Sequence, residues 1–197
     1  MASFRPVESY RRGQGYQIIA GIDEVGRGAL AGPLVAAALV LRPHVKLGGL
    51  KDSKALRSQQ REHYASRIIA GAVAYAFGVV SAREIDRLGI AKANNVAFIR
   101  ALDGLRVRPD YVLADYFSLA GYRCPIEGVK GGDTDVRTIA AASVIAKVHR
   151  DGMMRKLHCR YPAYGFAKHV GYGTVLHRRA IRRYGLSPIH RCSFRLA

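Results

Sequence analysis

The chain has 197 residues, of which 49% are hydrophobic and 23% are charged. These proportions are typical of globular domains and exclude a disordered, collagen-like or low-complexity protein, and the length excludes two large domains. Thirty-two lysines and arginines against fourteen acids give a formal net charge of +18, which indicates a polyanionic partner, nucleic acid first. Membrane binding is a weaker interpretation, because the cations are spread along the chain rather than gathered on one amphipathic helix.

Targeting and cysteine signals are absent from the sequence. The longest strongly apolar run, 34–41, is too short to cross a bilayer, and the first sixteen residues have no apolar signal-peptide core. The three cysteines lie more than thirty residues apart, which matches neither a zinc spacing nor a disulfide framework. We therefore expect a cytoplasmic protein with reduced thiols and no membrane partner.

Two apolar segments predict paired strands near the start of the chain. The run QIIAGID from Gln17 predicts a buried strand that ends at Asp23 and Glu24, and the proline-bounded run 33–42 predicts its hairpin partner. The glycine-rich turn GRGALAG separates the two runs. The two acids and the glycines therefore lie between two strands.

Helices and strands alternate through the middle of the chain. Hydrophobic periodicity predicts a surface helix, a strand, one or two helices and a short strand, over 57–72, 72–80, 81–105 and 111–115. Ser81 and Glu84 form the capping-box pattern at the start of the third of these segments. The last strand ends at Asp115, again a carboxylate.

The C-terminal third combines a long helix with a basic segment. The alanine-rich stretch 134–158 predicts a helix that begins next to Asp133. The last forty residues are rich in Gly, Tyr, His and Arg and predict an ordered loop followed by a short basic helix. We expect one α/β domain over 1–197, a mixed sheet flanked by helices, with about 158–197 as a C-terminal substrate-handling segment.

Four of the fourteen acids fall where sheet proteins build sites, at strand ends and before a helix: Asp23, Glu24, Asp115 and Asp133. Clustered carboxylates persist only with cations or protons, and they are the hard ligands that Mg²⁺ and Mn²⁺ prefer. Two such ions about 4 Å apart could support phosphodiester cleavage. The alternative, in which these acids close turns and cap a helix, has about equal weight from composition alone.

Six sequence blocks in order resemble one family. They are GIDEVGRGALAGP, DSKAL, the strand ending at Asp115, GGD followed by IAAASVIAKVHRD, YGFAKHVGYGT and SPIHRCSF. Together they cover about Gly21 to Phe194 and resemble the type 2 ribonuclease H family, specifically bacterial ribonuclease HII. Singly such blocks are weak signals, but their order and spacing make the resemblance specific.

The resemblance implies a ribonuclease H-like fold and a metal-dependent endonuclease, with Mg²⁺ or Mn²⁺ as cofactor and two ions during catalysis. It implies hydrolysis of RNA in RNA–DNA hybrids and incision 5′ of ribonucleotides in duplex DNA, as in ribonucleotide excision repair, leaving 5′-phosphate and 3′-hydroxyl ends. The family's four active-site acids fall on the set named above. We expect a monomer.

The same resemblance assigns substrate-binding residues. The family's GRG turn falls on Gly26, Arg27 and Gly28, whose backbone would contact the 2′-hydroxyl that distinguishes RNA from DNA. The junction-sensing tyrosine falls on Tyr172, against the sugar that follows the ribonucleotide. Phosphate contacts fall on Lys54 and Arg191. For each of these residues a structural role, as turn glycine, half-buried aromatic or solvated surface charge, is the alternative.

Three departures from the family pattern concern the pocket and its charge. Tyr116 follows the third acid, where the family usually has glycine. The family's KGD block reads KGGD, which displaces Lys130 by one residue, and its HKGY block reads HVGY, with Val170 in place of a cation. None of these changes removes a predicted metal ligand.

Two rival functions stay open. A non-catalytic nucleic-acid-binding protein would use the same basic surface, and Tyr116 is its best support. A nuclease of the same fold that cleaves only DNA, such as a resolvase or an integrase-like enzyme, is the other rival. The GRG turn and Tyr172 count against it.

Overall fold

The computed structural model describes residues 4–43, 45, 47, 50, 57–116 and 121–195. At its centre lies a sheet in the order β3-β2-β1-β4-β5. Its strands are Ile19–Val25 (β1), Leu34–Leu41 (β2), Ala72–Val80 (β3), Tyr111–Asp115 (β4) and Ile126–Val129 (β5). Strands β1, β2 and β3 pair antiparallel, whereas β1–β4 and β4–β5 are parallel. The predicted mixed sheet and the β1–β2 hairpin are confirmed.

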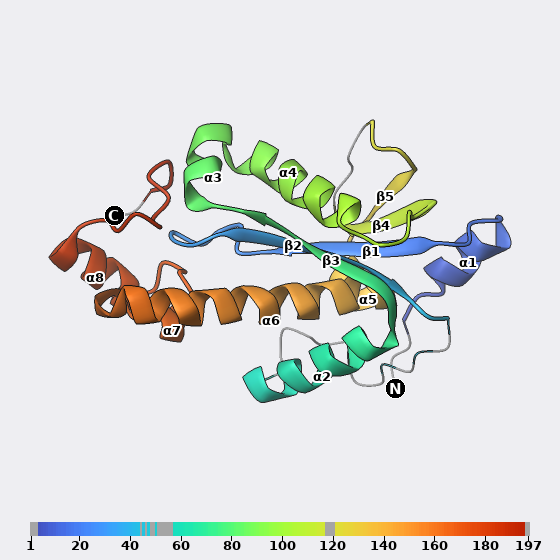
Figure 1. Ribbon diagram of the computed structural model, residues 1–197, viewed down its shortest axis with the longest axis horizontal. Helices are drawn as coiled ribbons and strands as arrows, with labels where there is room; N and C mark the ends of the chain where they lie inside the picture. Colours follow the sequence, from blue (N-terminus) through green and yellow to red (C-terminus); the bar gives the residue numbers. More distant parts are fainter. Residues whose placement is uncertain are drawn as a thin grey trace.

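Helices cover both faces of the sheet (Figure 1). One face carries α3 (Ala82–Leu88) and α4 (Ile90–Asp103), and the other carries α2 (Ser58–Gly71) and the long α6 (Arg137–Arg160). The short α5 (Gly132–Asp135) precedes α6, and α1 (Val7–Gly13) precedes β1. The 3₁₀ turn η2 (Pro162–Tyr164), α7 (Phe166–His169) and the basic α8 (Val175–Tyr184) follow α6.

Strand β2 explains why its sequence is apolar without interruption. All eight of its residues are buried. Alternate side chains enter two different cores: Leu34 and Ala36 pack on the α4 side, and Leu39 and Leu41 pack on the α6 side. A strand covered on both faces reads as a continuous hydrophobic run, because neither face contacts water.

Two glycines let the covering helices approach the sheet closely. A Cβ on Gly21 of β1 would collide with the backbone of Thr138 in α6, and one on Gly78 of β3 would collide with the carbonyl of Ala97 in α4. Larger side chains at these positions would push the helices away from the sheet. This packing brings the α6 side chains close to the end of β1.

The predicted helix over 134–158 is divided in the structure. Val136 is extended (φ −114°, ψ 121°), so α5 ends at Asp135 and α6 begins at Arg137. Asp133 therefore lies inside a short helix rather than at an N-cap. Helix α1 and strand β5, which are only seven and four residues long, were not predicted from the sequence. Among the described residues no helix is long and apolar enough to span a membrane.

Candidate active site

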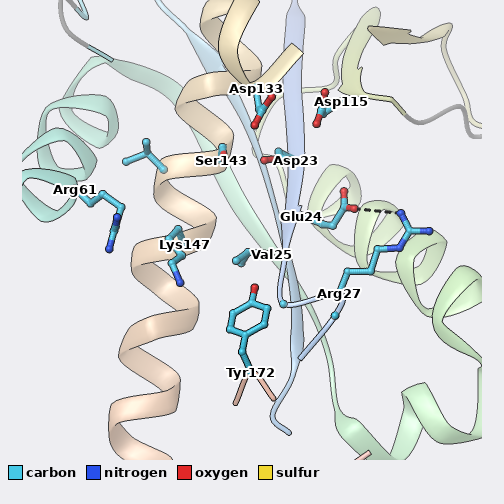
Figure 2. Close-up of a pocket in the computed structure, with 13 residues that line it drawn as sticks. Asp23, Glu24, Val25, Arg27, Arg61, Asp115, Asp133, Ser143, Lys147 and Tyr172 are labelled. Atoms are coloured by element: carbon cyan, nitrogen blue, oxygen red, sulfur yellow. Dashed lines mark ion pairs between the residues drawn. The ribbon is translucent and has the colours of Figure 1, made fainter. Parts of the chain in front are cut away.

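Four carboxylates meet at one end of the sheet. Because β1 and β4 are parallel neighbours, their carboxyl ends bring Asp23, Glu24 and Asp115 to the same edge. Asp133 reaches this edge from α5, shortly after β5 ends. All four acids line one pocket of about 420 Å³ (Figure 2). The structure thus brings together acids that are up to 110 residues apart in the chain.

The same pocket contains most of the expected substrate-binding residues: Gly26, Arg27, Gly28 and Tyr172. Three polar residues that the sequence analysis missed also line it: Arg61, Ser143 and Lys147. Ser143 and Lys147 are four residues apart on α6 and therefore share one helix face, a spacing from which they could have been found. Arg61 had no such signal, because it is one of several cations on a surface helix.

Successive residues of a strand point to opposite faces of the sheet, so the two acids of β1 have different neighbours. Asp23 points toward α6, where the Ser143 side chain lies beside it and favours its ionised form. Glu24 points toward α4, where the buried Asn94 lies beside it and favours its ionised form. The Asn94 amide makes no hydrogen bond of good geometry, although its side chain is enclosed in protein.

Burial and mutual repulsion disfavour the negative charges of the β1 acids. Burial raises the pKa of Asp23 well above its usual value, and the charges of Glu24 and Asp115 raise this pKa further. Burial also raises the pKa of Glu24, opposed by the Arg27 guanidinium 3.7 Å away. Carboxylates in such surroundings are stabilised by a cation or a proton.

The chemistry of these donors fits a divalent cation. Oxygen ligands in this number are those that Mg²⁺ and Mn²⁺ prefer, and Asp23 and Asp133 are only 6% and 5% exposed. Among the described residues, no three His, Cys, Asp or Glu side chains are already grouped as a metal-binding set. Coordination therefore requires the carboxylates to turn toward a common point in the pocket.

Two glycines next to Asp133 set the position of α5. Gly131 has φ +69°, a left-handed conformation that glycine adopts without strain. The N–H of Gly132 donates to Oδ1 of Asp115 over 2.8 Å, which ties the end of β4 to the start of α5. The KGGD sequence thus joins the third and fourth acids, and Lys130 remains exposed.

The two glycines of the GRG turn differ in why a side chain is absent at each position. Gly26 has φ +88°, and a Cβ there would collide with the Arg150 side chain. Apart from Gly28 and its two chain neighbours, no atom of the described residues lies within 4 Å of the place where a Cβ on Gly28 would lie. The fold therefore requires glycine at position 26, whereas at position 28 only a ligand entering the pocket would use the absence of a side chain.

Arg150 of α6 packs against this turn from the interior of the protein. Its guanidinium is fully buried and donates to the carbonyls of Pro33, Val170 and Ala31, at 2.8, 2.9 and 3.3 Å. It also lies 5.5 Å from the ring centre of Tyr172. Burial lowers the pKa of Arg150. One side chain therefore links the residues just before β2 to the segment that carries the predicted junction tyrosine.

The structure does not support a phosphate contact by Arg191. This side chain is fully buried, and it donates to the carbonyls of Gly32 and Arg27. Burial, with the charge of Arg150, lowers its pKa to about 9. Arg191 holds the glycine turn from inside the protein, so the prediction that it contacts phosphate is corrected to a structural role.

Tyr172 extends its ring into the pocket from the segment between α7 and α8 (Figure 2). The Lys147 ammonium lies 5.8 Å from the ring centre, within the range of a cation–π contact. Lys147 also donates to Asp151 over 2.9 Å. The ring is therefore approached by two cations, from Lys147 and Arg150.

The remaining predicted contact, Lys54, lies outside the described residues. The departures at Tyr116 and Val170 share one backbone feature, since they are the two non-glycine residues with positive φ in the described chain, at +52° and +44°. A glycine, as the family usually has at position 116, adopts this conformation without strain. The Tyr116 side chain is 77% exposed and does not line the pocket.

Comparison with known proteins agrees with this architecture. Residues 20–197 match the family model described as Ribonuclease HII. The chain is 49% identical over 180 residues to Ribonuclease HII of Desulfitobacterium hafniense, which covers 91% of this chain and 69% of that protein. It is 49% identical over 194 residues to Ribonuclease HII of Bacillus licheniformis, with coverages of 98% and 74%.

A solved structure gives the same result for the fold. The crystal structure of the ribonuclease H2 from Pyrococcus horikoshii OT3 matches with a TM-score of 0.78 at 28% sequence identity. The match covers 92% of this chain and 95% of that one. The expected ribonuclease H-like α/β fold is thereby confirmed, and the chain belongs to the ribonuclease HII family as a type 2 ribonuclease H.

Proposed function

We propose that this ribonuclease H incises 5′ of ribonucleotides embedded in duplex DNA and hydrolyses RNA in RNA–DNA hybrids, leaving 5′-phosphate and 3′-hydroxyl ends. One observation carries the proposal: four acids, a glycine turn and a tyrosine from distant parts of the chain line a single pocket. The acids suit phosphodiester hydrolysis, and the turn and the ring suit recognition of a sugar. The enzyme would act in the removal of ribonucleotides from DNA.

In this proposal the four acids hold one or two divalent cations, Mg²⁺ or Mn²⁺. A bound cation would lower the pKa of water and stabilise the charge on the scissile phosphate and the leaving oxygen. The protein's own contribution is to fix the carboxylates. Ser143 faces Asp23 from α6, Asn94 faces Glu24 from α4, and the Gly132 N–H holds Asp115.

Recognition of the ribonucleotide is assigned to the GRG turn and to Tyr172. The open space at Gly28 allows backbone groups of the turn to approach the 2′-hydroxyl, the group that distinguishes RNA from DNA. Tyr172 would pack against the next sugar, where a second 2′-hydroxyl would spoil the contact. The two elements are held side by side, since Leu30 and Ala31 donate their N–H groups to the Gly171 carbonyl.

Cations around the acids suit the phosphates of a duplex. Arg27, Arg61 and Lys147 line the same pocket as the carboxylates. The net charge of +18 supplies a longer-range attraction that does not depend on sequence. We propose that the enzyme binds as a monomer, which size-exclusion chromatography with light scattering would test.

The decisive experiment compares three duplexes of equal length. One contains a single ribonucleotide in DNA, one is a continuous RNA–DNA hybrid, and one is an all-DNA control. Each is incubated with Mg²⁺, with Mn²⁺ and with EDTA. We expect cleavage of the first two only, and only with metal. Cleavage that survives chelation would overturn the proposed cation role, and cleavage of the DNA control would favour the DNA-only rival.

Substitution of one acid separates catalysis from binding. Asp23→Asn should lower the cleavage rate at least about 100-fold, because several kcal/mol of charge stabilisation depend on the ligand set. Duplex binding in a filter or fluorescence-anisotropy assay should change little, because the basic surface is intact. Loss of binding together with a loss of thermal stability would show that Asp23 supports the fold instead.

A further inference from the structure

Three histidines form a buried cluster beneath the Tyr172 segment. His169 ends α7, His177 lies in α8, and His190 follows α8 near the end of the described chain. Their exposed fractions are 7%, 0% and 2%. The rings of His169 and His177 stack with centres 4.4 Å apart, and Phe166 packs against all three rings.

Backbone N–H groups determine which nitrogen of each ring carries the proton. The Ser187 N–H donates to His190 Nδ1 over 2.9 Å, so that nitrogen is an acceptor and the proton of the neutral ring is on Nε2. His190 Nε2 lies 3.1 Å from His177 Nε2, which must then accept. The proton of His177 is therefore on Nδ1, which donates to the Tyr172 carbonyl over 2.9 Å.

The third ring follows the same logic. The Gly171 N–H donates to His169 Nδ1 over 3.3 Å, so the His169 proton is on Nε2 and is donated to the Tyr164 carbonyl over 2.8 Å. Burial favours the neutral form throughout, and it lowers the pKa of His177 to about 4. A second proton on His177 would place two N–H groups against each other at the contact with His190.

The cluster holds the backbone on both sides of the junction ring. His177 accepts from the His190 ring and donates to the Tyr172 carbonyl. His169 accepts from the N–H of Gly171, the residue before Tyr172. The Tyr172 N–H donates to the His169 carbonyl over 2.9 Å. The ring itself extends into the pocket (Figure 2).

We propose that His177, in its Nδ1-protonated neutral form, is a positioning residue that sets the Tyr172 ring for reading the sugar after a ribonucleotide. It touches neither the acids nor the substrate and acts only through the Tyr172 carbonyl. This inference rests on the proposed role of Tyr172, and it adds a specificity-determining network that extends to Ser187 through His190.

The test compares two variants of similar size that differ in where the amide nitrogen lies. In His177→Asn the nitrogen takes the place of Nδ1 and can still donate to the Tyr172 carbonyl. In His177→Gln it reaches the place of Nε2, so that donation is lost. The measured quantity is kcat/KM on the single-ribonucleotide duplex divided by kcat/KM on the continuous hybrid, with Tyr172→Ala as reference.

We expect His177→Gln to lower this ratio about three- to tenfold, the effect of one lost hydrogen bond, in the same direction as Tyr172→Ala. His177→Asn should stay within about twofold of the wild type. Equal losses in the two histidine variants, or none, would overturn the inference while Tyr172→Ala still lowers the ratio. An unchanged ratio in Tyr172→Ala would instead refute the proposed role of the tyrosine.

A measurement on the unmodified protein keeps the inference testable if a variant does not fold. Long-range ¹H–¹⁵N NMR spectra distinguish histidine tautomers and charge states. We expect neutral rings at pH 7, with His177 protonated on Nδ1 and with His169 and His190 protonated on Nε2. A His177 ring that is protonated on Nε2 alone could not donate to the Tyr172 carbonyl, and a charged ring could not accept from His190. Either result would refute the proposal.

Discussion

Arg150 offers a quantitative test of how the two substrate-reading elements are held. The change is Arg150→Met, which keeps much of the volume of the side chain and removes its donors. The carbonyls of Pro33 and Ala31 are in buried contacts, and the carbonyl of Val170 is in a partly buried one. Each buried acceptor left without a partner costs about 1–3 kcal/mol.

Relief from burying a cation offsets part of this loss, because a buried charge itself carries a desolvation penalty. The net loss of unfolding free energy should be about 3 kcal/mol, which corresponds to a fall in melting temperature of about 6–12 °C for a chain of this length. Thermal denaturation followed by circular dichroism measures it. Arg150→Lys, which keeps the charge but not the fork of donors, should lose less.

Function provides the second readout of the same variant. The Arg150 side chain bonds both to Pro33, between the GRG turn and β2, and to Val170 in the segment that carries Tyr172. Cleavage of the single-ribonucleotide duplex should therefore fall more than the stability loss alone explains, measured well below the melting temperature. A variant as stable and active as the wild type would show that the three carbonyls find other partners, and the reasoning would fail.

Three further substitutions follow from the structure. Gly28→Ala should lower kcat/KM on the single-ribonucleotide duplex at least about tenfold while leaving the melting temperature unchanged, because only a bound substrate would meet the added methyl group. Arg100 and Ser81 lower the pKa of Glu84 to about 2. Glu84→Gln should therefore lower the unfolding free energy by about 1–2 kcal/mol at pH 7, measured by urea denaturation. The difference in stability between wild type and variant should shrink as the pH falls from 4.5 toward 2, because the wild-type carboxylate is then also neutralised. Tyr116→Gly should raise the unfolding free energy by about 0.5–1 kcal/mol by removing left-handed strain, and unchanged or lower stability in calorimetry would contradict this.

The convergence of the acids was predictable because it depends on local patterns that the fold preserves. The apolar runs that end at Asp23 and Asp115 are strands buried on both faces, and such strands carry their sites at their ends. Sequence alone does not give the strand order. The parallel pairing of β1 with β4, across about ninety residues of chain, is what brings the two ends together.

Residues whose role comes from long-range packing could not be assigned in this way. Arg191 has the appearance of a surface cation in the sequence, and its burial results from the C-terminal segment passing beneath a turn some 159 residues earlier. Asn94 likewise gave no signal, because its place beside Glu24 depends on how α4 packs on the sheet. Strand β5 was missed because four residues, IEGV, carry no usable period.

The two buried arginines hold the glycine turn and the tyrosine segment, the two elements of the proposed recognition site, in fixed positions. Arg191 donates to carbonyls of the turn. Arg150 donates to the carbonyl of Pro33, just before β2, and to that of Val170, two residues before Tyr172. Both guanidiniums are enclosed, and their bonds are made to backbone carbonyls, so backbone positions rather than side-chain charges are fixed. The proposed recognition of a sugar would need fixed backbone positions, because a single hydroxyl group is distinguished by its distances from the backbone of the turn and from the tyrosine ring.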